Sequence, residues 1–132
     1  MGENWADIGK LFTPMAVSGA VAALEAQFLL PNQKIQIPFI GSVDARVGLG
    51  VHTALAQAVG TVGAQYILPN LETGSWAQYK DQIEMFGTPV LVGAADVALL
   101  KIAGNPISTQ QAFLIGASSS LIGEYVKSAL FQ

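Results

Sequence analysis

The sequence predicts an all-α fold, a small polytopic membrane bundle of about four helices rich in Gly and Ala. Two observations predict this fold class. Hydrophobic residues make up 52% of the chain and charged residues only 11%, whereas about 25% of the residues of a soluble domain are charged. The chain also contains several apolar stretches long enough to cross a bilayer. Because no linker rich in Pro, Ser or charge divides it, we expect residues 1–132 to form a single membrane-embedded domain.

The first two helices are expected at residues 12–30 and 47–68. The second stretch has no formal charge and lies between Arg46 and Pro69. Its roughly 22 residues, with a rise of about 1.5 Å each, match a hydrocarbon core about 30 Å thick. The first stretch has one charged residue, Glu25, and stops at Pro31, since proline cannot continue the helical hydrogen bonds. Pro69 gives the second stretch the same stop signal.

The third and fourth helices are expected at residues 86–103 and 110–131. The third has Pro89 near its start, where a proline in the first turn is tolerated, and closes at Gly104. The fourth is the least apolar, because it carries three serines at residues 118–120 and then Glu124 and Lys127. Its assignment to the membrane therefore depends on where these polar side chains point.

Two connecting segments have patterns of their own. Residues 33–39 alternate apolar and polar side chains, which predicts a short extended loop that touches the interface or a partner and is too short for a sheet. Residues 75–86 place aromatic and aliphatic side chains at helical spacing, which predicts an interfacial amphipathic helix. Trp76 and Tyr79 in this helix, together with Trp5, are the expected interfacial anchors, since Trp and Tyr have an apolar body and a polar tip.

Two short stretches are nearly identical in sequence. Residues 26–32 are AQFLLPN and residues 64–70 are AQYILPN. This likeness predicts that the helices descend from one repeated helical unit.

Small residues four positions apart predict the faces on which the helices pack. In lipid, helices associate by close approach of their backbones, which small side chains permit. The contacts form within the chain or between copies of it. The predicted helix-packing residues are Gly19 and Ala23 in the first helix, Ala56, Gly60 and Ala64 in the second, Ala94 and Ala98 in the third, and Gly116 and Ser120 in the fourth.

Each predicted helix has an ionisable residue within its apolar run: Glu25, His52, Asp96 and Glu124. Such residues usually face a bundle interior, water or a partner, because a charge in hydrocarbon is costly. One hypothesis is a proton or cation path through Glu25, His52 and Asp96. The simpler and preferred hypothesis is structural: Glu25 and Glu124 reach the headgroups or Lys127, and Asp96 bonds to a Ser, Thr or Gln of a neighbouring helix.

Composition and motifs argue against several function classes. The chain has no cysteine and one histidine, and it lacks the spaced motifs of hydrolases, zinc proteases and nucleotide-binding proteins. We therefore expect no enzyme activity, no catalytic set, no cofactor and no metal site. Six Lys and Arg residues and a net charge of -3 leave no basic stripe for nucleic acid.

The helices rich in Gly and Ala, two Leu-Pro-Asn sequences, GAADVA at residues 93–98 and SSLIGEYV at residues 119–126 resemble small membrane proteins of large icosahedral DNA viruses. Those proteins lie in the membrane beneath the capsid and are held there by minor capsid proteins. The resemblance implies a structural virion component, in the internal membrane of the particle, that self-associates or docks to capsid proteins. It carries over no functional residue.

Two alternatives stay open at the level of the sequence. One is a small ion or proton channel or transporter, favoured by the polar residue in each helix and by segments that end at proline. The other is a soluble helical subunit whose apolar surface is covered by partners in a larger assembly. The expected partners are the lipid bilayer and further copies of the chain or other membrane or capsid proteins.

Overall fold

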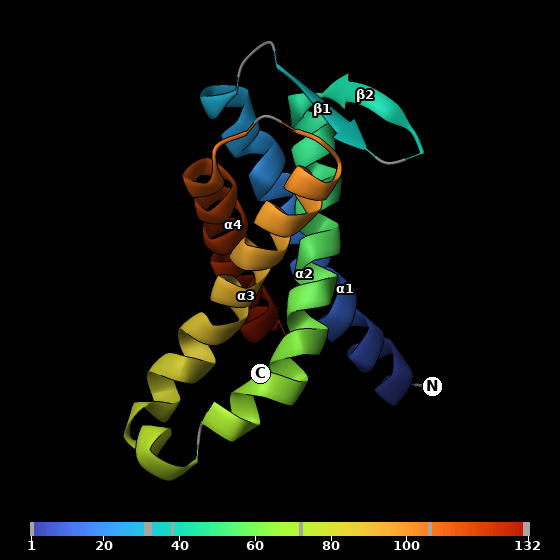
Figure 1. The fold of residues 1–132 in the computed structure, drawn as a ribbon. Helices are drawn as coiled ribbons and strands as arrows, with labels where there is room; N and C mark the ends of the chain where they lie inside the picture. Colours follow the sequence, from blue (N-terminus) through green and yellow to red (C-terminus); the bar gives the residue numbers. More distant parts are fainter. Residues whose placement is uncertain (1, 31–32, 38, 72, 106, 131–132) are drawn as a thin grey trace.

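Four helices form a bundle in this computed structural model, which describes residues 2–30, 33–37, 39–71, 73–105 and 107–130, without the side chains of residues 2–7, 11, 71, 74 and 75 (Figure 1). The helices are α1 (Gly2–Leu29), α2 (Ala45–Leu71), α3 (Lys80–Ile102) and α4 (Thr109–Leu130). At about 1.5 Å per residue they are about 33 to 42 Å long. Consecutive helices pack together, α4 closes on α1, and α2 meets α4 across the middle. The all-α fold predicted from the sequence is confirmed.

The two ends of the bundle differ. One end carries residues 33–44 and the connection at residues 103–108, and we call it the hairpin end. The other, the terminal end, carries the first turn of α1, the last turn of α4 and the 3-10 turn η1 (Gly74–Tyr79) between α2 and α3 (Figure 1). The helices therefore run alternately toward one end and the other, and α2 and α4 both start at the hairpin end.

Two helices begin earlier than expected. α1 starts at Gly2 rather than at residue 12, and α3 starts at Lys80 rather than at residue 86. The separate amphipathic helix predicted at residues 75–86 is therefore wrong: its first part is η1 and its second part is the start of α3. Its helical spacing runs directly into the apolar run of the third segment, and α3 continues through Gly87 and Pro89 at the junction.

Three prolines lie inside helices. Pro89, expected in a first turn, lies further along because α3 starts earlier, Pro14 lies inside α1, and α2 continues past Pro69 to Leu71. Each proline deprives the carbonyl four residues before it of its helical donor. Membrane helices tolerate this change because neighbouring helices and polar side chains supply other partners.

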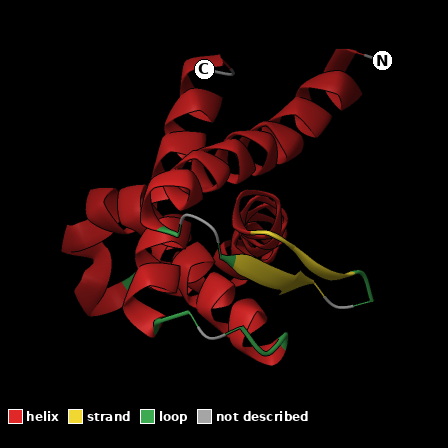
Figure 2. Cartoon of the chain, turned by 90° about the horizontal axis from the view of Figure 1, so that it is seen from above, coloured by secondary structure: helices red, strands yellow, loops and turns green. Residues whose placement is uncertain are grey.

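Residues 33–39, predicted as a loop too short for a sheet, contribute a strand instead. β1 (Lys34–Ile37) pairs with β2 (Gly41–Asp44) in an antiparallel hairpin, with Ile37 opposite Gly41. The alternation seen in the sequence sets the two faces of β1, since Ile35 and Ile37 are buried and Lys34 and Gln36 are exposed. Both strands pack against α2, and in the view from above the hairpin lies beside the end of a helix (Figure 2). The pair is short, and α2 covers its apolar face.

The apolar core lies at the hairpin end of the bundle. It is built from the last turns of α1 and α3, the first turns of α2 and α4, and β1, which meet at this end. Its members are Ala22, Ala26, Leu30, Ile35, Ala45, Leu49, Leu100, Ile107, Ala112 and Ile115. The interior toward the terminal end has a different, more polar composition.

Candidate functional site

α2 has a polar buried face and an apolar exposed face. His52, Thr53 and Gln57 are buried, with Thr53 and Gln57 one turn apart. Large apolar side chains recur every three or four residues on the exposed side, which places them on one helix face. A helix facing water has the opposite distribution. The exposed set is Val47, Val51, Leu55, Val59, Val62, Tyr66 and Ile67.

The other helices also turn large apolar side chains outward. Soluble monomers rarely expose contiguous apolar patches larger than a few hundred Å². Here exposed apolar side chains occur on every helix of the bundle. They include Phe12, Leu24 and Phe28 of α1, Met85, Phe86, Val90 and Ile102 of α3, and Leu114, Leu121, Ile122 and Tyr125 of α4.

Three helices meet at Asp96. The side chain is fully buried in α3, and the hydroxyl of Thr53 on α2 donates a hydrogen bond of 2.6 Å to Asp96 Oδ2. A Cβ placed on Gly116 of α4 would lie 2.9 Å from that same oxygen. Asp96 therefore joins α2 by a hydrogen bond and α4 by close backbone packing.

A second polar cluster lies closer to the terminal end. Gln57 Nε2 donates to Glu124 Oε1 on α4 at 3.0 Å and to Thr61 Oγ1 at 3.1 Å. Lys127 Nζ lies 2.7 Å from the other oxygen of Glu124, one turn along α4. The Glu124 charge thus has an ion-pair partner, as well as the amide of a residue buried in α2.

Glu25 joins α1 to α4. Ser119 donates a hydrogen bond of 2.6 Å to Glu25 Oε1, and Ser118 donates one of 2.9 Å to Glu25 Oε2. Both carboxylate oxygens are therefore occupied by hydroxyls of one neighbouring helix. All three serines that made the fourth segment less apolar lie inside the bundle, since Ser119 and Ser120 are buried and Ser118 is half-buried against Glu25.

At the hairpin end, His52 and Asn105 bind β1. His52 Nε2 lies 2.9 Å from the Gln36 carbonyl. The Asn105 side chain accepts from the Gln36 amide at 2.6 Å and donates to the Gln36 carbonyl at 3.1 Å and the Leu100 carbonyl at 3.2 Å. The Asn105 amide pairs with both backbone groups of Gln36, much as a neighbouring strand would, at the edge of β1 that faces away from β2.

The carboxyl group of Asp44 lies at the start of α2. Its oxygens accept hydrogen bonds from the side chain and the backbone amide of Arg46, which hold the pKa of this exposed carboxyl below its usual range. Asp44 thereby caps the first turn of α2.

The three residues of the hypothetical proton or cation path pair with different elements. Glu25 bonds to α4, His52 to β1 and Asp96 to α2. Within the described part of the chain, no two of the three are joined by a direct hydrogen bond. Thr53 and Gln57 were not predicted as interior partners. The available signal was their spacing: Thr53, Gln57 and Thr61 recur every four residues in the most apolar segment.

No family model, curated protein or solved structure matches the chain. Among the described residues, no group of three or more His, Asp or Glu side chains is placed to hold a metal ion. The candidate site is the polar interior of the bundle.

Glycines lie at each contact between neighbouring helices. A Cβ on Gly19 of α1 would lie 3.0 Å from the Gly50 carbonyl of α2, and one on Gly60 of α2 would lie 2.5 Å from Val92 Cγ2 of α3. The other two contacts are equally close. They place Gly93 of α3 against Phe113 of α4, Gly116 of α4 against Gly93 and Asp96 of α3, and Gly123 of α4 against Pro14 of α1.

The predicted packing residues are mostly inside the bundle. Gly19, Ala56, Gly60, Ala64, Gly116 and Ser120 are buried, and Ala23 is half-buried beside Gly50. Ala94 and Ala98 are exposed, so the predicted packing face of α3 is incorrect for contacts within the chain. Gly93 occupies the contact with α4 instead. Three small residues in succession at 93–95 left the face of α3 undetermined in the sequence.

Two of the expected anchors lie at the terminal end. Trp76 and Tyr79 of η1 are exposed, and their ring centroids are 6.0 Å apart. The side chain of Trp5 lies outside the described residues. An aromatic pair at one end of an apolar surface suits the depth of lipid headgroups.

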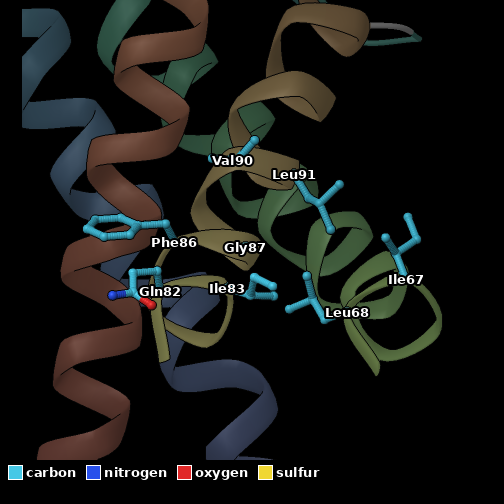
Figure 3. Close-up of a pocket in the computed structure, with 8 residues that line it drawn as sticks. All are labelled: Ile67, Leu68, Gln82, Ile83, Phe86, Gly87, Val90 and Leu91. Atoms are coloured by element: carbon cyan, nitrogen blue, oxygen red, sulfur yellow. The ribbon is translucent and has the colours of Figure 1, made fainter. Parts of the chain in front are cut away.

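An apolar cleft of about 350 Å³ opens between the end of α2 and the start of α3. Ile83 and Leu91 of α3 point toward Ile67 and Leu68 of α2 across it (Figure 3). Gly87 at its floor lets Leu68 approach closely. Gln82 is the polar member of the lining, so the cleft extends the apolar outer surface.

Proposed function

We propose that the chain is an integral membrane protein whose four helices cross a bilayer, and that its role there is structural. The observation that carries the proposal is the distribution of side chains. Polar residues such as Thr53, Gln57 and Asp96 are buried, and large apolar side chains cover the outside of every helix. A bilayer favours this arrangement and water does not. Three segments, in α1, α2 and at residues 76–102, are long and apolar enough to cross.

α4 is expected to cross with the other three. It packs along α1 and α3, and its 22 residues give a length of about 33 Å. Ser119 and Ser120 are buried while Leu114 and Leu121 are exposed, so its polar residues do not oppose insertion. Even the least apolar segment therefore presents an apolar face to the outside.

The structural role follows the resemblance to membrane proteins of large icosahedral DNA viruses, and it stays a prediction. Close glycine contacts between all neighbouring helices suit a rigid membrane component. The tip of the hairpin, with Phe39 and Ile40 exposed beyond the bundle, suits docking to a protein layer at the hairpin end. Copurification with virus particles, and retention when their outer capsid is removed, is the expected outcome for a virion component.

Membrane insertion is tested by extracting membranes of cells that express the chain with alkaline carbonate and then with detergent. We expect the chain to stay in the pellet at high pH and to leave only with detergent. Release into the alkaline supernatant would instead support the soluble subunit covered by partners. A soluble protein trapped in the same vesicles is the control for complete opening.

A further inference from the structure

A line of polar side chains leads from Asp96 toward the terminal end. Thr53, which bonds to Asp96, is followed on α2 by Gln57 one turn further on. Gly116, which touches Asp96, is followed on α4 by Ser120 and then Glu124 at the same spacing. Because α2 and α4 both start at the hairpin end, Gln57 and Ser120 each lie about 6 Å closer to the terminal end than Thr53 and Gly116, the residues that touch Asp96.

Three buried atoms along this line have no hydrogen-bond partner among the described residues. They are Asp96 Oδ1, Gln57 Oε1 and Ser120 Oγ. A buried polar atom without a partner destabilises the folded protein. Ordered water is the usual partner of such atoms, provided that several polar groups surround it. These three unpaired atoms, on α2, α3 and α4, are polar groups of the kind that such a water needs.

The line opens to the outside at the terminal end. A cavity of about 520 Å³ between α3 and α4 is lined by Glu124 and Lys127, with Asp81 and Glu84 from the first turns of α3. Glu124 Oε1 accepts the hydrogen bond from Gln57. Glu124 therefore connects the cavity, which is rich in charged groups, to the buried part of the line.

Toward the hairpin end, the line is closed. Leu49 is one turn before Thr53 on α2, Leu100 is one turn after Asp96 on α3, and Ala112 is one turn before Gly116 on α4. All three are at most 1% exposed, and Ile35 of β1 belongs to the same cluster. A layer of buried apolar side chains thus lies between Asp96 and the hairpin end.

We propose that Asp96 is a proton-binding site that exchanges protons with the aqueous phase at the terminal end, through water held by Ser120 and Gln57. The carboxyl releases a proton to this water and regains one by the same route, so no other reactant is needed. No cationic side chain pairs with Asp96 in the described part of the chain. Its neighbouring donor is the neutral hydroxyl of Thr53, and an unpaired charge at this depth would be costly.

Other titratable groups face the interior, and the experiment must separate them from Asp96. Glu25 faces it from α1, His52 from α2, and Glu124 with Lys127 from α4; Asp81 and Glu84 of α3 line the cavity. A protonated carboxyl group gives a C=O stretching band in the infrared spectrum. The band of Asp96 is the one that disappears in Asp96→Asn but remains in Glu25→Gln and in Glu124→Gln. The full chain is used, in phosphatidylcholine vesicles.

The measurement is the rate at which this band shifts when the vesicles are transferred to D₂O. We expect rapid exchange in the unchanged protein and exchange slower by about tenfold or more in Gln57→Leu and in Ser120→Val, because each removes a group that holds the water. Gln65→Leu, the same change at an exposed position of α2, should leave the rate unaltered. Circular dichroism verifies that each variant keeps its helices.

Four results would overturn the proposal: no protonated band from Asp96, a band that does not exchange, exchange equally fast in all variants, or loss of the band on adding Na⁺ at constant pH. The last result would indicate a cation site instead. The inference rests on membrane insertion, so the same vesicles are extracted with carbonate. If carbonate releases the chain from the vesicles, the proposed membrane location is refuted. If the chain stays in the vesicles and any of the four results is found, only the proton-binding site is refuted.

Discussion

Two glycines of α2, three residues apart, have different surroundings. A Cβ on Gly60 would lie 2.5 Å from Val92 Cγ2 and 3.0 Å from the Val92 backbone nitrogen, whereas a Cβ on Gly63 would meet nothing within 4 Å. The α2–α3 contact therefore depends on the absence of a side chain at Gly60 but not at Gly63.

Gly60→Ala should lower the free energy of unfolding by about 1 to 3 kcal/mol, because α3 must shift to admit the methyl group. Gly63→Ala should leave it unchanged or raise it by about 0.5 to 1 kcal/mol, the usual advantage of Ala within a helix. Unfolding of both variants in mixed micelles with increasing SDS, followed by circular dichroism, gives the comparison. Equal effects of the two substitutions would contradict the α2–α3 contact.

The hydroxyls of Ser118 and Ser119 both bind Glu25 across the α1–α4 contact. Replacing both serines by Ala should destabilise the protein by about 0.6 kcal/mol for each hydrogen bond, the average measured between helices in a membrane protein, and by at most about 1.7 kcal/mol for each. Ser128→Ala, at an exposed position of the same helix, is the control. If the double variant unfolds at the same SDS fraction as this control, Glu25 does not hold α1 to α4.

Among the elements, the hairpin depends most on a distant residue. Asn105, in the connection between α3 and α4, binds both backbone groups of Gln36. Asn105→Ala should leave these groups without their partner and raise the amide hydrogen exchange of residues 34–44 by one to two orders of magnitude, for a loss of about 1 to 3 kcal/mol. Asn70→Ala, which removes a contact to the Tyr66 carbonyl near the other end of α2, should leave that exchange unchanged. Equal exchange in both variants would show that β1 is held by other contacts.

The helices were predictable from the sequence because apolar runs of about 20 residues are themselves the signal for spanning helices. Their starts were less predictable, since α1 and α3 include the more polar residues that precede their apolar runs. The hairpin was missed because β2, with the sequence GSVD, has four residues and a single large apolar side chain, too short a pattern to predict a strand. It is a strand only because β1 and α2 lie beside it.

The sequence predicted which ionisable side chains lie inside the bundle, but not which hydrogen-bond partner each of them has. The apolar context of Glu25, Asp96 and Glu124 already placed them away from lipid. Which hydroxyl or amide each one meets depends on the rotation of every helix about its axis. Close contacts at positions such as Gly93 and Gly116 fix that rotation, and a run of small residues leaves several rotations open.

For the whole molecule, the decisive property is that its outer surface is apolar between two polar ends. The native chain has no cysteine, so single cysteines can report the surroundings of chosen positions. Phe39 marks the hairpin end, Gln78 the terminal end and Leu55 the exposed face of α2 between them. If the bundle crosses a bilayer, these three positions face three different environments.

In sealed vesicles, a membrane-impermeant maleimide added outside should label either Phe39→Cys or Gln78→Cys, and opening the vesicles should allow labelling of the other. Ser128→Cys should behave as Gln78→Cys does, because α4 ends at the same side as η1 (Figure 1). Leu55→Cys should react only with a lipophilic maleimide in both conditions, since its thiol would lie in hydrocarbon, where a charged reagent does not enter. Labelling of Leu55→Cys by the impermeant reagent as fast as Gln78→Cys would mean that the outer face of α2 meets water, and the apolar surface would then have to be covered by protein partners rather than by lipid.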